Sequence, residues 1–102
     1  MTDVIKDLAK TIKERKDASP KNSYTALLLS GGISKCIDKL EEEFGELKEA
    51  LNKKENEVHE AADLFYHLLV VLEVANIEFQ DILDELEKRK KESGLEEKKN
   101  RK

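Results

Sequence analysis

The sequence predicts an all-α protein, a bundle of four or five helices. Residues that interrupt helices are few: the 102 residues include four Gly and one Pro, while good helix formers such as Glu, Lys, Leu and Ala are abundant. Apolar residues recur at three- and four-residue steps, the spacing of one helix face. A chain of this length forms one domain by default, which we expect to span residues 1–92.

The first helix is expected over residues 2–17. Ile5, Leu8 and Ile12 recur there at helical spacing and would form its inward face. The helix must end before Pro20, because the residue that precedes a proline disfavours the α conformation.

A short second helix is expected over residues 24–29, with Asn22 or Ser23 as its cap and Gly31-Gly32 at its end. Hydroxyl groups beside a lysine at a helix start would suit a phosphate group, although capping alone would also explain them. The residues concerned are Lys21, Ser23, Tyr24 and Thr25.

The third helix is expected over residues 34–53. Its carboxylates Glu43 and Glu46 lie about 75° and 135° from the centre of the apolar stripe, on the shoulder of the expected core face. The small Ala50 shares that flank. The stripe itself consists of Ile33, Ile37, Leu40, Phe44, Leu47 and Leu51.

The fourth helix, residues 57–75, is apolar on nearly every side from residue 61 onward. Such a helix is buried all round, which in so short a chain indicates a second subunit and thus a homodimer. Asp63 interrupts the apolar sequence, and burying a lone carboxylate costs several kcal/mol unless a cation accompanies it. Glu60 and His67 lie on the same side. A fifth helix is expected over residues 79–91.

Two pairs of carboxylates, Glu43 with Glu46 and Glu60 with Asp63, are spaced i, i+3 on consecutive helices. If the helices pack side by side, the four carboxylates converge, and oxygen ligands suit Mg²⁺ or Mn²⁺. Such an ion can bind phosphates, and Glu42 or one of the four could act as general base. The pair on the third helix alone would indicate only a solvated face, and a buried histidine such as His67 is commonly structural.

Charge and composition exclude several functions. The net charge is −4, yet residues 88–102 hold eight Lys or Arg against three Glu, so the body is strongly acidic and nucleic acid is not expected as a partner. No apolar stretch is long enough to span a membrane. The lone Cys36 suits a reducing cytoplasm. Residues 93–102 are expected to be a disordered, charged tail.

Over residues 5–90 the sequence resembles the phosphoribosyl-ATP pyrophosphatase family of histidine biosynthesis, within the all-α nucleotide pyrophosphatases. Five segments carry the resemblance: I-K-E-R-K at residues 12–16, P-K-N-S-Y-T at 20–25, Gly32 with Lys35 and Lys39, E-E-x-x-E at 42–46, and H-E-A-A-D-L-F-Y-H-L-L-V at 59–70.

The resemblance implies Mg²⁺-dependent hydrolysis of the α–β phosphoanhydride of phosphoribosyl-ATP, giving phosphoribosyl-AMP and pyrophosphate, by a homodimer. It implies that the metal ligands are Glu43, Glu46, Glu60 and Asp63, with Glu42 as a further ligand or the base. The candidate catalytic residues are thus Glu42 and Glu43. The residues it implies for the substrate phosphates are Lys21, Ser23, Tyr24, Thr25, Lys35 and Lys39.

Three positions depart from the family pattern. Gly31 stands where a lysine is common, Glu41 replaces a glycine, and Gly45 lies inside the ligand-bearing helix, where glycine costs about 1 kcal/mol relative to alanine. None removes an expected ligand. Two alternatives stay open: a broader nucleoside triphosphate pyrophosphatase, and a helical dimerisation module without enzymatic activity.

Overall fold

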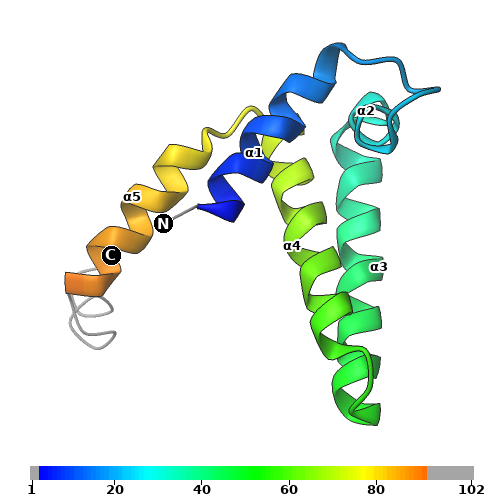
Figure 1. Ribbon diagram of the computed structural model, residues 1–102, viewed down its shortest axis with the longest axis vertical. Coiled ribbons are helices and arrows are strands. Elements are labelled where there is room, and N and C mark those ends of the chain that lie inside the picture. Colours follow the sequence, from blue (N-terminus) through cyan, green and yellow to red (C-terminus); the bar gives the residue numbers. More distant parts are fainter. Residues whose placement is uncertain (1–2, 92–102) are drawn as a thin grey trace.

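The computed structural model describes residues 3–91, and within them the all-α prediction is confirmed. Figure 1 shows the helices in chain order, with a 3₁₀ turn, η1, directly after the first. The expected tail, residues 93–102, lies outside the described residues. The elements are α1 (Val4–Glu14), η1 (Arg15–Asp17), α2 (Tyr24–Ser30), α3 (Gly32–Lys53), α4 (Glu57–Val74) and α5 (Phe79–Lys91).

The helix ends follow local chemistry, and the expected boundaries hold to within a few residues. The Asp3 carboxylate caps α1 by accepting a hydrogen bond from the Lys6 N–H at 3.0 Å. The chain then leaves the helical conformation at Ala18, ahead of the proline, as expected. The α2–α3 junction is a sharp turn in which Gly32 has φ of +84°, in the left-handed region that favours glycine.

Helices α3 and α4 form an antiparallel hairpin (Figure 1). Helix α1 packs on α4 at one end of this hairpin, and α5 points away from the hairpin. The buried apolar core lies at this same end of the hairpin. It consists of Ile12 from α1, Cys36 from α3, and Leu69 and Val70 from α4. The Cys36 thiol donates a hydrogen bond to the Leu28 carbonyl at 3.2 Å, and burial raises the pKa of this thiol.

Within one chain, the apolar stripe expected as the core face of α3 is not the face that is buried. The buried residues of α3 are Cys36, Glu43 and Ala50, one every seven positions along a single line. The small side chains Cys36 and Ala50 allow α4 to approach closely along this line, and much of the wide apolar stripe beside it stays exposed. Four residues of the stripe are exposed: Ile33, Ile37, Phe44 and Leu51.

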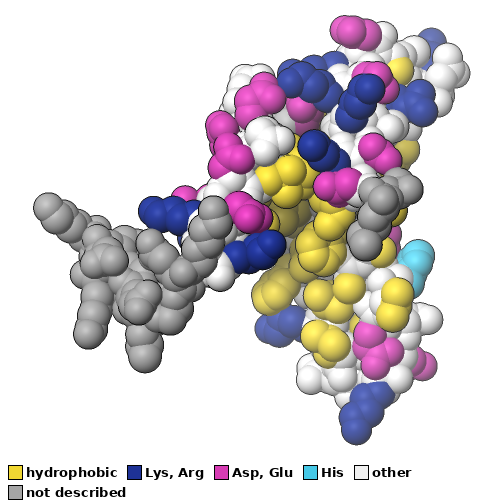
Figure 2. Space-filling view, turned by 60° about the vertical axis from the view of Figure 1, so that its left-hand side comes forward, with side chains coloured by type: hydrophobic (Ala, Val, Ile, Leu, Met, Phe, Trp, Pro, Cys, Tyr) yellow, Lys and Arg dark blue, Asp and Glu magenta, His cyan; other side chains and the backbone are white. Residues whose placement is uncertain are grey.

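The apolar surface continues from α3 onto α4. Phe65 and Leu68 are exposed as well, and Leu40, Phe44, Leu64 and Leu68 line an apolar hollow between the two helices. Figure 2 shows hydrophobic side chains gathered along the hairpin. The expectation that α4 is buried all round is therefore not met within one chain. Among residues 3–91, no helix is long and apolar enough to cross a membrane.

Candidate functional site

A tight turn sets the register between the two carboxylate-bearing helices. Lys54 and Asn56 both have φ of 59°, a left-handed conformation that reverses the chain within three residues. The Glu55 N–H donates back to the Ala50 carbonyl at 3.1 Å, which closes the end of α3. The last turns of α3 therefore lie beside the first turns of α4, and the two acidic pairs face each other.

The structure brings three of the four predicted carboxylates into one group and places the fourth, Asp63, in an adjoining group. Glu43, Glu46 and Glu60 each offer one oxygen within 4.8 Å of the others, so atoms from both helices meet. Glu60 also belongs to a second group with Asp63, in which the ligand atoms are equally close. Three of the four carboxylates thus converge as the i, i+3 spacing predicted, whereas Asp63 adjoins them through Glu60.

Glu43 is the most deeply placed member, with only 7% of its surface exposed. Its Oε2 atom is buried without a hydrogen-bond partner among the described residues, and so is Oε2 of Glu60. Burial, together with the neighbouring carboxylates of Glu46 and Asp63, raises the pKa of Glu43 to about 7, while Lys39 opposes the shift. A buried, unpaired carboxylate of this kind needs either a proton or a cation.

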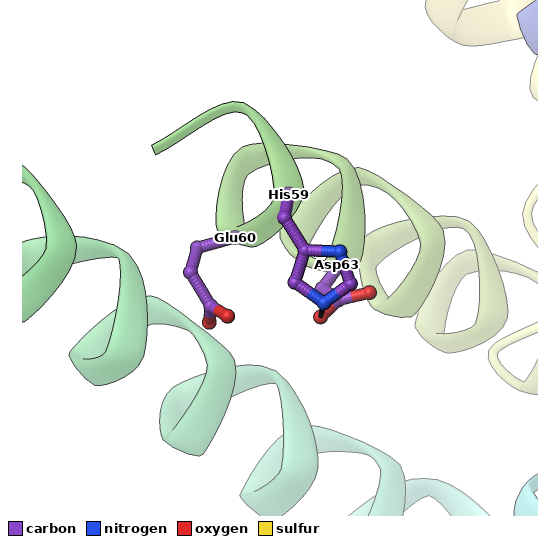
Figure 3. Close-up of side chains that lie close together, drawn as sticks. All are labelled: His59, Glu60 and Asp63. Atoms are coloured by element: carbon purple, nitrogen blue, oxygen red, sulfur yellow. Dashed lines mark ion pairs between the residues drawn. The ribbon is translucent and has the colours of Figure 1, made fainter. Parts of the chain in front are cut away.

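His59 was not among the predicted site residues, yet it lies at the edge of the cluster (Figure 3). Its Nε2 atom lies 3.3 Å from Oδ2 of Asp63. In Figure 3 the imidazole overlaps Asp63, whereas Glu60 points toward α3. The i, i+4 spacing of His59 and Asp63, which places them on one helix face, is the signal that would have identified it.

Glu42 and Lys39 lie beside the carboxylate group, toward solvent. The Lys39 ammonium is 3.4 Å from the Glu42 carboxylate. Burial lowers the pKa of Lys39, but the hydrogen bond to Glu42 and the charges of Tyr24, Glu42 and Glu43 outweigh it, so the net shift is upward. Lys39 therefore stays a full positive charge next to both the carboxylates and the start of α2.

The three hydroxyl residues at the start of α2 have separate tasks in this structure. Ser23 caps the helix by accepting from the Ala26 N–H at 3.1 Å, as the capping interpretation required. The Thr25 hydroxyl hydrogen-bonds the hydroxyl of Tyr66. Tyr24 stacks on Tyr66, with ring centres 6.5 Å apart, and keeps half of its surface exposed. Ser23 and Thr25 thus already have partners, while Tyr24 presents its ring to solvent.

The remaining predicted lysines are on the surface. Lys21 lies in the loop before α2, and Lys35 lies in the first turn of α3, where its side chain passes over Gly31. A lysine at position 31 would meet the Lys35 side chain, since a Cβ atom there comes within 3.3 Å of it. Gly31 therefore leaves room for the Lys35 side chain.

His67 is buried beneath the aromatic pair, with 5% of its surface exposed. Its Nδ1 atom bonds to the backbone carbonyl of Asp63 at 2.9 Å, and since a carbonyl only accepts, Nδ1 carries the proton. The ring packs edge-on against Tyr66 and Tyr24. His67 thus supports the helix turn that carries Asp63 and does not itself reach the carboxylate group.

Comparison with known proteins identifies the family. The family model described as phosphoribosyl-ATP pyrophosphohydrolase matches residues 5–90. A phosphoribosyl-ATP pyrophosphatase of Rhizobium etli is 46% identical over 97 residues, covering 93% of this chain and 91% of the relative. Those of Rhizobium meliloti (44%; 99% and 97%) and Roseobacter denitrificans (43%; 89% of each) are similar over nearly their full lengths. The chain therefore belongs to the phosphoribosyl-ATP pyrophosphohydrolase family.

Proposed function

We propose that this protein hydrolyses the α–β phosphoanhydride of phosphoribosyl-ATP to phosphoribosyl-AMP and pyrophosphate, as a step of histidine biosynthesis. The observation that carries the proposal is the convergence of Glu43, Glu46 and Glu60 from two helices, with Asp63 adjoining them. Family membership supplies the substrate. The single buried thiol, Cys36, agrees with the reducing cytoplasm in which we place this activity.

The donor set fits a divalent cation. Two buried carboxylate oxygens, Oε2 of Glu43 and of Glu60, have no partner among the described residues. Carboxylate oxygens on rigid helices suit a hard ion, so we assign Mg²⁺, with Mn²⁺ as a substitute, to Glu43, Glu46, Glu60 and Asp63. When bound, the ion would polarise a phosphoryl oxygen and lower the pKa of a water molecule.

The other residues bind substrate and move the proton. Glu42 is exposed and stands outside the two ligand groups, so its carboxylate is free to accept the proton of the attacking water; Glu43 is the alternative base. Lys39, now paired to Glu42, would exchange this partner for a substrate phosphate. The other phosphate contacts that we propose are Lys21, Ser23, Tyr24, Thr25 and Lys35.

We also propose that the protein works as a homodimer. The exposed apolar face on α3 and α4 includes Ile33, Ile37, Phe44, Phe65 and Leu68, and a contiguous exposed apolar face is typical of a protein–protein interface. A second copy of the hairpin would cover it. Light scattering should give twice the chain mass, and Phe44→Glu should shift the protein to monomer; a monomeric wild-type protein would refute the dimer.

Measurement of pyrophosphate release tests the activity. Purified protein should release pyrophosphate from phosphoribosyl-ATP with Mg²⁺ and not after chelation. Glu46→Gln should abolish release, whereas the control Glu49→Gln, on the same helix but paired with Lys53, should not. If the protein releases pyrophosphate from common nucleoside triphosphates faster than from phosphoribosyl-ATP, it is a broader pyrophosphatase. If it binds metal but hydrolyses none of these substrates, it is a helical module without enzymatic activity.

A further inference from the structure

Tyr24 is a half-exposed aromatic side chain beside the candidate site. It stacks on Tyr66, with ring centres 6.5 Å apart and ring planes 17° apart, yet 53% of its surface is exposed. This separation lies toward the far end of the range for aromatic pairs, about 4.5–7 Å, so the two rings overlap only in part. Much of the Tyr24 ring face is therefore open to another planar group.

The ring of Tyr66, on which Tyr24 stacks, is held from two sides. Its hydroxyl forms a hydrogen bond with the Thr25 hydroxyl, and the buried His67 packs edge-on against it with ring centres 5.0 Å apart. His67 is held in turn by the backbone carbonyl of Asp63. Stacking on a fixed support favours one orientation of the Tyr24 ring. A ring that is ordered before binding loses less conformational entropy when a ligand stacks on it.

A positive charge connects the aromatic pair with the carboxylate group. The Lys39 ammonium lies 3.4 Å from the Glu42 carboxylate, and the charges of Tyr24 and Glu43 both act on the pKa of Lys39. Lys39 therefore stands between the exposed ring and the carboxylates. A nucleotide carries a planar base at one end and phosphates at the other. The order of ring, lysine and metal-binding carboxylates matches that layout.

We propose that the Tyr24 ring stacks on the purine base of phosphoribosyl-ATP and thereby selects a substrate that carries a base. An aromatic side chain can recognise a base in this way because every base has a π face. Stacking uses the face of the Tyr24 ring, so the hydroxyl at its edge stays available for the phosphate contact proposed above. The inference rests on the proposed function and adds recognition of the base to it.

Two ligands that need no hydrolysis separate base recognition from phosphate recognition. Phosphoribosyl-AMP, a proposed product, carries the base, whereas pyrophosphate carries phosphates alone. By calorimetry in Mg²⁺, Tyr24→Leu should weaken phosphoribosyl-AMP binding by roughly 5- to 150-fold, the range for one base stacked on an aromatic side chain. It should leave pyrophosphate affinity unchanged. Tyr24→Phe should restore most of the lost affinity, because it keeps the ring.

The matched control is Leu27→Ala, in the next turn of α2. Leu27 is 52% exposed, almost the same as Tyr24, and Leu27→Ala should bind both ligands as the wild type does. Unchanged phosphoribosyl-AMP affinity in Tyr24→Leu, equal losses for both ligands, or a Tyr24→Phe protein as weak as Tyr24→Leu would overturn the inference. So would a change of mass in light scattering of Tyr24→Leu, because it would place the ring in a subunit interface.

Magnetic resonance of the wild-type protein tests the stacking without relying on a variant's folding. The protein has two tyrosines and no tryptophan, and Tyr66→Phe assigns the signals of the two rings. Phosphoribosyl-AMP should move the ring-proton resonances of Tyr24 upfield, because the ring current of a stacked base shields protons above its face. Pyrophosphate should cause no such upfield shift. Binding of phosphoribosyl-AMP without the shift would refute the stacking.

The two proposals fail separately. Wild-type protein that releases pyrophosphate from phosphoribosyl-ATP, but whose Tyr24 resonances do not move with phosphoribosyl-AMP, would refute this inference alone. An upfield shift of Tyr24 in a protein that releases no pyrophosphate would support base stacking and refute the proposed function.

Discussion

The two ends of the α3–α4 hairpin differ in what fills the space between the helices. At the end near α1, Cys36, Leu69 and Val70 pack with Ile12 in a dry apolar core. At the turn end, Glu43 and Glu46 face Glu60 across the same pair of helices. One end gains stability from apolar burial, whereas the other buries carboxylates that repel one another.

This difference indicates that residues at the end near α1 stabilise the fold, whereas residues at the turn end serve function. Carboxylates in mutual contact lower the stability of the metal-free fold, and an apolar side chain of similar size at Glu43 would pack better. The core end anchors the helices so that the turn end can hold charges in a strained arrangement. Substitutions at the two ends should therefore have opposite consequences for stability and metal binding.

The largest effect is expected at the core. Ile12→Ala truncates the largest fully buried side chain of the described residues, 1% exposed, and should lower the free energy of unfolding by about 2–5 kcal/mol. Mn²⁺ affinity of the fraction that stays folded should be unchanged, because Ile12 lies at the other end of the hairpin. Urea denaturation and Mn²⁺ calorimetry check this, and a parallel loss of metal affinity would show that the two ends are not independent.

At the turn end, Glu43→Gln should stabilise the metal-free protein. The folded-state pKa of Glu43, about 7, lies above the value of about 4.3 for an unfolded glutamate. The folded state thus binds the extra proton, and stability contributed by this group is lost as the pH rises from about 4.3 to about 7.

Glu43→Gln should remove that pH dependence. It should also raise the free energy of unfolding by roughly 1–3 kcal/mol at pH 8 when a chelator is present. It should also lose Mn²⁺ binding. Chemical denaturation as a function of pH measures the first effect. A Glu43→Gln protein that is less stable than wild type at pH 8 would contradict the contrast between the two ends.

A smaller effect is expected from Glu60→Gln. This variant replaces the carboxylate that belongs to both ligand groups with an amide. Metal affinity should fall by about 10–100-fold, while the unfolding free energy without metal should change less than in Glu43→Gln, because Glu60 is less buried than Glu43. Glu57→Gln, one turn earlier and outside both ligand groups, is the matched control. Equal metal affinity in both variants would remove Glu60 from the site.

The smallest effect concerns the hydrogen bond between Thr25 and Tyr66, which lies between the two ends. Thr25→Val and Tyr66→Phe both remove it and should each cost about 1 kcal/mol of stability. If Thr25 also contacts a substrate phosphate, only Thr25→Val should raise KM in the pyrophosphate-release assay. An equal KM in the two variants would limit Thr25 to a structural role.

Much of the fold was predictable because local chemistry decides it. Pro20 sets the end of the first helical segment, Ser23 starts α2 and the Gly31-Gly32 pair ends it. The convergence of the carboxylates was predictable too, since a short turn makes α3 and α4 antiparallel neighbours and the i, i+3 spacing keeps each pair on one face.

Other features were not predictable because they depend on which surfaces pack together. A helical wheel ranks the stripe with Ile33 and Phe44 as the best inward face, yet the line through Cys36 and Ala50 faces α4 since its small side chains permit closer approach. His59 was missed because a lone exposed histidine in a charged helix start resembles an ordinary surface residue until its distance to Asp63 is known.

The sequence by itself determined the helices, their boundaries, the two acidic pairs and the family resemblance, since each rests on neighbours within a few positions along the chain. Only the tertiary structure decided that Oε2 of Glu43 is buried without a partner and that the apolar stripe stays exposed in a single chain. It alone placed His59 beside Asp63 as well. These facts depend on the approach of α4 to α3, because burial and coordination distance are properties of packed surfaces.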